Sequence, residues 1–364
     1  MQLLYTAVSL IGGTALLILA RISRKSDTMA LFDKRFFSLS IGAVLVVMAA
    51  ELMTVFFEGP ASPHRIPHIV GNLLGFSISP FIPLLIACTI DGSRKRQLLL
   101  FGVPAALNVV LTALSTCFPL VFWVNEQNLY LRGRAFGLYI VSYVAALFCL
   151  LLQTLNHTKA YQNSSRSIPI VLFVFVVIGT AGQVLAPPVH ITWLCVSFSI
   201  ILYYVYYCEL SRQIDGLTGL LNRRTYEYHL CEIRHAANAA VLLFDIDDFK
   251  DVNDLYGHPF GDHSLIVIAA CIKKVFFKTG LCFRIGGDEF CVLSRSADLP
   301  AIAGAQRRFL HEIELLRHSD PRLPQVSVGY ALTDRRSPDI ADAVLRADQN
   351  MYRFKRRKKQ SSPS

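Results

Sequence analysis

The amino-acid sequence predicts two parts of different fold class, an N-terminal all-α polytopic membrane domain and a C-terminal α/β domain. The first observation is composition: 53% of the 364 residues are hydrophobic and only 17% are charged, with a mean hydropathy of +0.43. The second is that the long apolar runs lie almost entirely before about residue 207. The third is that the remainder alternates strand-like and helix-like patterns. A membrane half followed by a soluble half accounts for all three.

The apolar half contains segments long enough to cross a bilayer, which requires about 20 mainly apolar residues per helix. Seven segments qualify, roughly 3–20, 36–57, 68–90, 98–120, 136–153, 168–186 and 189–207. Only "PPVH" separates the last two, so six spans remain an alternative. The first segment lacks the basic start and small-residue cleavage site of a signal peptide, so we expect it to stay as a span.

Basic residues predict the orientation, because Lys and Arg gather in cytoplasmic loops. The loops after the first, third and fifth segments are basic, whereas the opposite loops hold only Arg65, Arg132 and Arg134. We therefore expect a multi-pass protein of the inner (cytoplasmic) membrane, anchored in the lipid bilayer, with its N-terminus outside and its C-terminal half in the cytoplasm. The nine cysteines form no CxxC pair, as expected in a reducing compartment. The net charge of +10 reflects topology and a basic C-terminal end rather than nucleic-acid binding.

Glu51 is the one clearly ionisable residue inside a long apolar stretch, "VVMAAELMTVFF". A carboxylate within the membrane is costly, which makes it a candidate functional residue. The alternative is a protonated or locally hydrogen-bonded Glu that helps helices to pack. No partner for it is evident from the sequence, so its role stays open. A sensory or anchoring membrane half is favoured over a transporter, whose paired broken helices are not evident.

The organisation predicted from these patterns is a membrane domain over 1–207, a short helical connector over 208–217, and a catalytic domain over 218–360. In the last part we expect, in order, a helix from near Leu220, a buried strand, a helix, a hairpin, a helix, a strand and a basic final helix. The buried strand is Val241–Phe244, and the hairpin turns at Gly286–Gly287. This order favours a central antiparallel or mixed sheet flanked by helices.

Acidic residues lie where two of these strands end. Asp245 follows the buried strand, and Asp288 and Glu289 follow the two glycines of the hairpin. Carboxylates that converge repel one another unless a cation lies between them, and hard oxygen ligands suit Mg²⁺. Gly286 and Gly287 would let the backbone turn sharply and approach a nucleotide closely. The alternative is an acidic turn exposed to water.

Five blocks of the C-terminal part stand out. They are "DGLTGLLNRR" from Asp215, "FDIDDFKDVND" from Phe244, "GHPFGD" from Gly257, "RIGGDEF" from Arg284 and "ADQNMYRFK" from Ala347. In their order and spacing, residues 211–359 resemble the GGDEF domain of diguanylate cyclases along their whole length.

The resemblance implies condensation of two GTP molecules into cyclic di-GMP with release of two pyrophosphates. It implies that Asp245, Asp288 and the carbonyl of Ile246 bind Mg²⁺ (or Mn²⁺) and that Glu289 completes the acidic cluster. Asp288 or Glu289 would direct the proton of the attacking 3′-hydroxyl. The other positions that match substrate-binding residues of the family are Asn253 and Asp262 for guanine, His258 for the base pocket, and Lys250, Lys355 and Lys359 for phosphates.

The chain departs from the family at two places. The inhibitory RxxD motif is replaced by "FKTG", with Phe277 and Gly280 at the two key positions, and Lys359 stands where an Arg is usual. Each active site holds one GTP, so the resemblance also implies a homodimer, whose geometry the membrane half would control. Effectors of cyclic di-GMP would then be indirect partners. The alternatives are a catalytically silent GTP-binding membrane receptor, a transporter with a regulatory nucleotide domain, and a mononucleotide cyclase.

Overall fold

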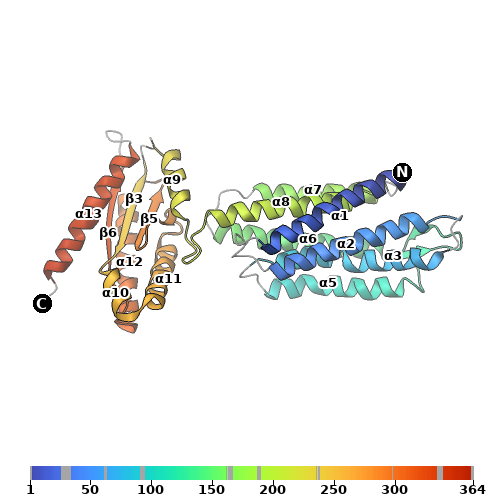
Figure 1. Ribbon diagram of the computed structural model, residues 1–364, viewed down its shortest axis with the longest axis horizontal. Coiled ribbons are helices and arrows are strands. Elements are labelled where there is room, and N and C mark those ends of the chain that lie inside the picture. The colour runs from blue at the N-terminus through green and yellow to red at the C-terminus, as the bar shows by residue number, and fades with distance from the viewer. Residues whose placement is uncertain are drawn as a thin grey trace. The chain divides into compact units, whose positions relative to one another are not determined.

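The structure is a computed structural model that describes residues 2–25, 34–60, 64–90, 95–160, 162, 167–186, 190–234, 236, 238–296, 298–333 and 339–361. The chain divides into two compact units, Met1–Arg212 and Gln213–Ser364. Each unit has its own hydrophobic core, and the ribbon in Figure 1 shows the helices and strands of both.

The first unit is a bundle of helices with one small hairpin. Its elements are α1 (Gln2–Lys25), α2 (Lys34–Phe57), α3 (Arg65–Ile78), α4 (Phe81–Cys88), α5 (Lys95–Leu114), β1 (Phe122–Val124), β2 (Tyr130–Arg132), α6 (Phe136–Ala160), α7 (Ser167–Leu185) and α8 (Thr192–Arg212). Each of the seven predicted apolar segments is largely helical, and α8 continues five residues beyond its predicted end.

Seven membrane spans are not confirmed. Among the described residues, five helices are long and apolar enough to cross a membrane: α1, α2, α6, α7 and α8. The pair α3 and α4, bent by 40°, would make a sixth as one broken span, whereas the apolar part of α5, Leu98–Leu114, is shorter. Pro80 lies at the break, where its missing N–H interrupts helical hydrogen bonding.

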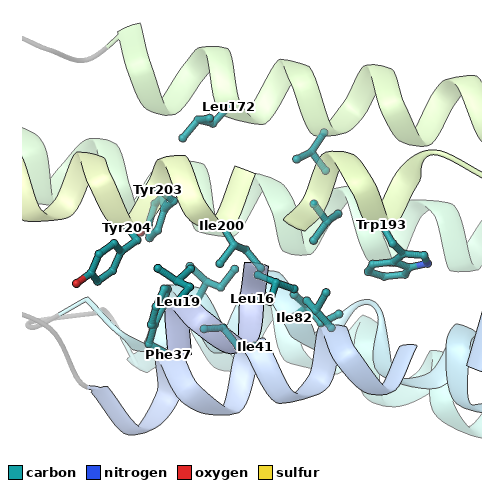
Figure 2. Packing of buried hydrophobic residues seen from close by; sticks show 14 of the residues in the cluster. Leu16, Leu19, Phe37, Ile41, Ile82, Leu172, Trp193, Ile200, Tyr203 and Tyr204 are labelled. Carbon is teal, nitrogen blue, oxygen red and sulfur yellow. The ribbon is translucent and has the colours of Figure 1, made fainter. Parts of the chain in front are cut away.

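Apolar side chains lie both inside and outside this bundle. Figure 2 shows the inside, where Leu16 of α1, Phe37 of α2 and Ile200 of α8 meet in one buried cluster. On the outside many large apolar side chains are exposed. Five of them are 62–69% exposed: Leu10, Ile11, Val141, Val171 and Ile178. Apolar surface on both sides of the same helices is what a bilayer environment requires.

The hairpin β1–β2 is the element of this unit that the sequence did not predict. Val124 pairs with Tyr130 next to a turn in which the Leu129 N–H donates to Asn125 Oδ1 at 2.8 Å. Asn128 adopts a left-handed conformation, φ 56°, which Asn tolerates better than most residues. Strands of three residues are too short to show an alternating pattern, so they leave almost no signal in a sequence.

The second unit contains a four-stranded sheet in the order β4-β5-β3-β6, with antiparallel pairing between all neighbours. Its elements are α9 (Arg223–Glu232), β3 (Ala240–Ile246), α10 (Phe249–Tyr256), α11 (His258–Phe276), β4 (Leu281–Arg284), β5 (Glu289–Ser294), α12 (Leu299–Ser319), β6 (Val326–Leu332) and α13 (Ile340–Ser361). The predicted strands and helices are all present. The short helix α10 was not predicted as an element.

Alternating side chains of β3 cover the two faces of the sheet. Leu242 and Phe244 pack with α11 and α12 in one cluster, and Val241 and Leu243 pack with α9 and α13 in another. Figure 1 shows α13 running along the sheet in this unit. Because both faces are covered, β3 reads as a continuous apolar run rather than an alternating one. The sheet is therefore the middle layer of a three-layer unit.

Strand β6 and helix α13 approach each other closely at Gly329. A Cβ atom there would lie 2.1 Å from the Met351 backbone nitrogen and 2.2 Å from the Ala347 carbonyl oxygen. We predict that Gly329→Ala separates α13 from the sheet and costs about 1–3 kcal/mol or more. Hydrogen–deuterium exchange of the full-length protein should show faster exchange in β6 and α13. Gly304→Ala is the control, because its Cβ would meet only ordinary contact, at 3.6 Å; equal exchange in both variants would contradict the prediction.

Candidate active site

Strand pairing brings the predicted acidic residues to one end of the sheet. Asp245, near the end of β3, is paired with Glu289, the first residue of β5. The Ile246 N–H donates to the Asp288 carbonyl oxygen at 3.2 Å, and the Ile285 N–H donates to the Glu289 carbonyl oxygen at 2.9 Å. The turn 285–288 is thus fixed by backbone hydrogen bonds on both sides. The expected placement of the hairpin beside the end of β3 is what the structure shows.

The acids at this end of the sheet affect one another's protonation. Burial, and then the nearby charges of Asp288 and Asp247, raise the pKa of Asp245 above its usual value, although Lys355 acts in the opposite direction. Burial also raises the pKa of Glu289, with further contributions from Asp288 and Asp245. Carboxyl pKa values raised by burial and by neighbouring acids indicate a site where negative charge is concentrated and a cation is favoured.

Two lysines of α13 reach these acids from the neighbouring layer. Lys355 Nζ forms an ion pair with Asp245, and it lies 3.9 Å from Asp247 Oδ1. Lys358 Nζ lies 3.2 Å from Asp247 Oδ2 and donates to the Val326 carbonyl oxygen at 2.8 Å. The sequence pointed to Lys355 but not to Lys358. Lys359 lies in α13, but its side chain is outside the described residues.

Arg284 fixes the turn from the opposite side and was not singled out from the sequence. Its Nη2 donates to the Gly287 carbonyl oxygen at 2.8 Å, and its Nη1 lies 3.2 Å from Asp215 Oδ1. Although burial opposes it, hydrogen bonds from Thr218 and the charge of Arg284 lower the pKa of Asp215. Asp215 and Arg284 open two of the five sequence blocks, and this ion pair is a physical reason for their occurring together.

The two glycines of the turn differ in their surroundings. Neither has a positive φ, so the expectation that the turn needs glycine's conformational freedom is wrong. At Gly286 a Cβ would lie 2.5 Å from Glu289 Oε2, so a side chain there would collide with the Glu289 carboxylate. At Gly287 a Cβ would meet nothing within 4 Å. Gly286 therefore leaves room for Glu289, and Gly287 borders open space.

The residues expected to bind the base lie around the junction of α10 and α11. A Cβ at Gly261 would lie 1.9 Å from Asn253 Oδ1, so Asn253 lies directly against the first turn of α11. His258 and Asp262 are exposed on that same turn. Gly257 allows the sharp change between the helices with φ +83°. The structure thus places Asn253, His258 and Asp262 together, and Lys250 is exposed on the first turn of α10.

The position of the missing inhibitory motif is tightly packed. A Cβ at Gly280 would lie 2.4 Å from the Leu293 carbonyl oxygen and 3.1 Å from the Ser294 Cα. Both contacts are to backbone, which cannot move aside as a side chain can. An aspartate therefore does not fit at this position without a shift of β5.

The donor set of the site suits a hard cation completed by other ligands. Among the described residues, no group of three or more His, Cys, Asp or Glu side chains is arranged to hold a metal ion. The predicted cluster of Asp245, Asp288 and Glu289 is therefore not a three-acid metal site in this arrangement. Two carboxylates and the Ile246 carbonyl remain, and Mg²⁺ commonly uses one or two carboxylates with waters and substrate phosphates. The residues present fit Mg²⁺ on those terms.

Comparison with known proteins agrees with the geometry. Residues 212–361 match the family model described as "Diguanylate cyclase, GGDEF domain". An uncharacterised 19.3 kDa protein from the repSA 5′ region of Streptomyces ambofaciens is 36% identical over 159 residues, which are 42% of this chain and 83% of that protein. The chain belongs to the GGDEF family. The resemblance stated from the sequence blocks is confirmed, and residues 212–361 are called the GGDEF segment below.

Two further relatives of the GGDEF segment have descriptive names. Diguanylate cyclase DgcM of Escherichia coli K12 is 34% identical over 154 residues, which are 40% of this chain and 37% of that protein. The chain thus spans well under half of that relative. The crystal structure of the GGDEF domain of DgcB from Caulobacter crescentus in complex with c-di-GMP is 29% identical, with a TM-score of 0.35, and covers 40% of this chain and 90% of that one.

We predict that Arg284→Lys loosens the turn of the GGDEF segment. Lysine lacks the planar fork that contacts the Gly287 carbonyl and Asp215 together. Opening of residues 285–288 should become easier by about 1–2 kcal/mol, because the lost hydrogen bonds involve a charged, half-buried group. Hydrogen–deuterium exchange at these amides measures this. Arg295→Lys is the control, since Arg295 pairs with Glu232 at an exposed site; similar protection at 285–288 in both variants would contradict the prediction.

Proposed function

We propose that the chain is a membrane-bound diguanylate cyclase that condenses two GTP molecules into cyclic di-GMP and releases two pyrophosphates. The observation that carries the proposal is the pairing of Asp245 with Glu289, with Asp288 beside them, inside the GGDEF segment. A curated relative of that segment is named as a diguanylate cyclase, which supports the same activity.

The acidic end of the sheet supplies the reacting groups in this proposal. Asp245, Asp288 and the Ile246 carbonyl would hold Mg²⁺ (or Mn²⁺), which neutralises phosphate charge and lowers the pKa of a bound hydroxyl. The pKa of Glu289 is raised, which brings it closer to the working pH of a general base. Asp288 or Glu289 would take the proton of the 3′-hydroxyl as its oxygen attacks the α-phosphate of the opposing GTP. Pyrophosphate leaves as the new phosphodiester forms.

Other residues would bind and orient GTP. Asn253 and Asp262 lie together at the junction of α10 and α11, where a carboxylate can accept hydrogen bonds from the N1–H and N2–H₂ edge of guanine. His258, exposed on the same turn, would shape the base pocket. Lys355 holds positive charge beside Asp245, and a triphosphate would compete for it. Lys250 and Lys359 would contact phosphates, and Gly287 would allow close approach of the nucleotide.

Two sites must face each other for this reaction, because each holds one GTP. We therefore propose a homodimer whose geometry is controlled by the first unit. Support for coupling comes from the chain itself: α8 runs to Arg212, and the Asn222 N–H donates to the Gln213 carbonyl oxygen at 2.9 Å. Residues 213–222 thus form a closed turn at the start of the second unit.

The second candidate is a catalytically silent receptor whose GGDEF segment binds GTP without turnover. Lys359 in place of the usual Arg is the feature that favours it, because a point charge replaces a bidentate contact. The acids at the end of the sheet favour the enzyme. A silent domain has no need of carboxylates whose pKa values are raised by burial and by neighbouring acids.

Product analysis decides between these two. Full-length protein in detergent, given Mg²⁺ and GTP, should yield cyclic di-GMP by mass spectrometry. Glu289→Gln should lower the rate by at least about 100-fold, the usual contribution of a general base. Glu314→Gln, an exposed change on α12, is the control and should keep the wild-type rate. GTP binding without product in the wild type, also with the first unit replaced by a constitutive dimeriser, would point to the silent receptor. A cyclic mononucleotide would point to a different cyclase.

The raised carboxyl pKa values predict a pH dependence. Asp245 and Glu289 bind protons at higher pH than ordinary carboxylic acids, so activity should fall at a correspondingly higher pH on the acid side. The charge of Asp348 helps to raise the pKa of Glu289. Asp348→Asn should therefore move the acid limb of the pH–rate profile to lower pH with little change at the plateau. If the acid limb of Asp348→Asn lies at the same pH as that of the control Glu314→Gln, this assignment is contradicted.

Cysteine labelling tests the proposed orientation. Cys117, after α5, and Cys231, on α9, are both exposed. The proposed topology puts Cys117 outside and Cys231 in the cytoplasm. A membrane-impermeant maleimide should label Cys117 in intact cells and Cys231 only after permeabilisation. Cys117→Ser and Cys231→Ser identify the two signals, and labelling of Cys231 in intact cells would reverse the orientation.

A further inference from the structure

The first unit contains a cavity of about 860 Å³, within the size range of small-molecule sites. It is lined by the start of α1, the end of α2, most of α3 as far as Phe76, strand β2, the start of α6, the end of α7 and the start of α8. By the predicted topology these helix ends, and the start of α3, lie on the side of the membrane opposite the cytoplasm. With that topology a ligand would reach the cavity from that side.

Glu51 lies in the wall of this cavity and has the partners that the sequence did not reveal. Gln183 Nε2 donates to Glu51 Oε1 at 2.7 Å, His190 Nδ1 lies 2.9 Å from the same oxygen, and the Tyr5 hydroxyl donates to Oε2 at 2.5 Å. The Thr192 N–H donates to Gln183 Oε1 at 3.0 Å, so the amide is oriented with its nitrogen toward Glu51. The expectation of a carboxylate without a partner is wrong.

Two groups donate hydrogen bonds to the Glu51 carboxyl, the Tyr5 hydroxyl and the Gln183 amide, and His190 Nδ1 lies within hydrogen-bond distance of it. A carboxylate offers about four acceptor positions, and three are taken. Glu51 therefore keeps one acceptor position beside the cavity while its side chain, 11% exposed, is held rigidly.

His68 provides a second acceptor in the wall. It is fully buried, and its Nδ1 lies 3.0 Å from Asn128 Oδ1. Asn128 Nδ2 donates to the Phe57 carbonyl, so Asn128 presents its oxygen and His68 Nδ1 carries the proton. In a neutral ring His68 Nε2 is then an acceptor, and it has no hydrogen-bond partner among the described residues. A buried acceptor left without a partner is costly, which points to a donor supplied by a ligand.

Carboxylates outnumber guanidinium groups in the wall. Glu51 and Glu58 are its two carboxylates, and Arg132 is its one guanidinium among the described residues. Arg132 donates to the Val184 carbonyl and lies 5.0 Å from the Phe136 ring centroid, so it is held in the wall. Two acids beside one guanidinium favour a ligand that carries positive charge.

Aromatic rings form another part of the wall. Phe76 and Tyr139 meet edge to face with ring centroids 4.8 Å apart, and Phe136 lies 5.7 Å from Tyr139. Trp193 lines the cavity near Glu51 and His190. Aromatic faces attract organic cations and also bury apolar carbon.

We propose that this cavity binds a small organic ammonium compound, with its charged amine against Glu51, a further N–H toward His68, and its apolar or aromatic body against Phe76, Tyr139 and Trp193. His190, Thr192 and Trp193 belong to the start of α8 or directly precede it, and α8 is also the last helix before the GGDEF segment. The proposal of ligand binding is argued from the cavity alone and does not depend on the proposed function. Control of cyclic di-GMP synthesis by this ligand rests on the proposed function.

Three probes of similar size test the chemistry: 2-phenylethylammonium, 2-phenylethanol and 3-phenylpropionate. The chain has two tryptophans, so full-length Trp123→Phe protein in nanodiscs leaves Trp193 as the fluorescent reporter. The ammonium probe should change Trp193 fluorescence with a Kd at least about tenfold below that of the alcohol. A response to none of the probes up to roughly 10 mM, equal affinities, or preference for the carboxylate would overturn the proposal.

Variants locate the binding. Glu51→Gln should remove the preference for the ammonium probe, whereas Glu209→Gln, an exposed change on α8 outside the cavity, should keep it. If Glu51→Gln does not fold, Glu58→Gln should still weaken ammonium binding severalfold, because it removes the other negative charge. Unchanged binding in a folded Glu51→Gln or Glu58→Gln protein counts against the site. Because fluorescence requires no turnover, failure of binding and failure of cyclase activity are separate results.

Discussion

The antiparallel register between β3 and β5 is the constraint on which the site depends. It places Asp245 opposite Glu289, so two acids from distant parts of the sequence are held at one end of the sheet. Burial raises the pKa of both acids, and the charge of Asp245 adds to the rise at Glu289, so the rest of the fold has to hold them together. The packed layers on both faces of the sheet provide this support, because a slip of one residue would move every side chain of β3 to the opposite layer.

Two cationic side chains offset the negative charge of the acids at this end of the sheet. Lys355 pairs with Asp245 and Lys358 with Asp247, both from α13. On the other side of the turn, Arg284 ties Asp215 to the Gly287 carbonyl. In the first unit neutral donors have a similar role, since Tyr5 and Gln183 donate hydrogen bonds to the Glu51 carboxyl. In both units buried carboxylates are surrounded by specific partners rather than by water.

Most of the fold and of the candidate site could be predicted from the sequence, because the signals for them were local. Strong apolar runs and strand–helix alternation located the main elements, and the five blocks located Asp245, Asp288 and Glu289. What it could not predict depends on distant pairings: the partners of Glu51 lie more than 130 residues away for Gln183 and His190. The roles of Lys358 and Arg284 likewise required the packing of α13 and of the turn. Span number stayed uncertain because α3 and α4 form one bent pair and α5 is short.

The packing at Gly280 has a consequence for regulation of the proposed enzyme. With the Leu293 carbonyl 2.4 Å from the site of a Cβ, an aspartate at this position requires a shift of β5. The acid of the feedback motif therefore cannot return by one substitution without disturbing the sheet. The proposed cyclase would keep synthesising its messenger as the product accumulates. Restraint would have to come from outside the GGDEF segment, either through the first unit or through removal of the messenger by other enzymes.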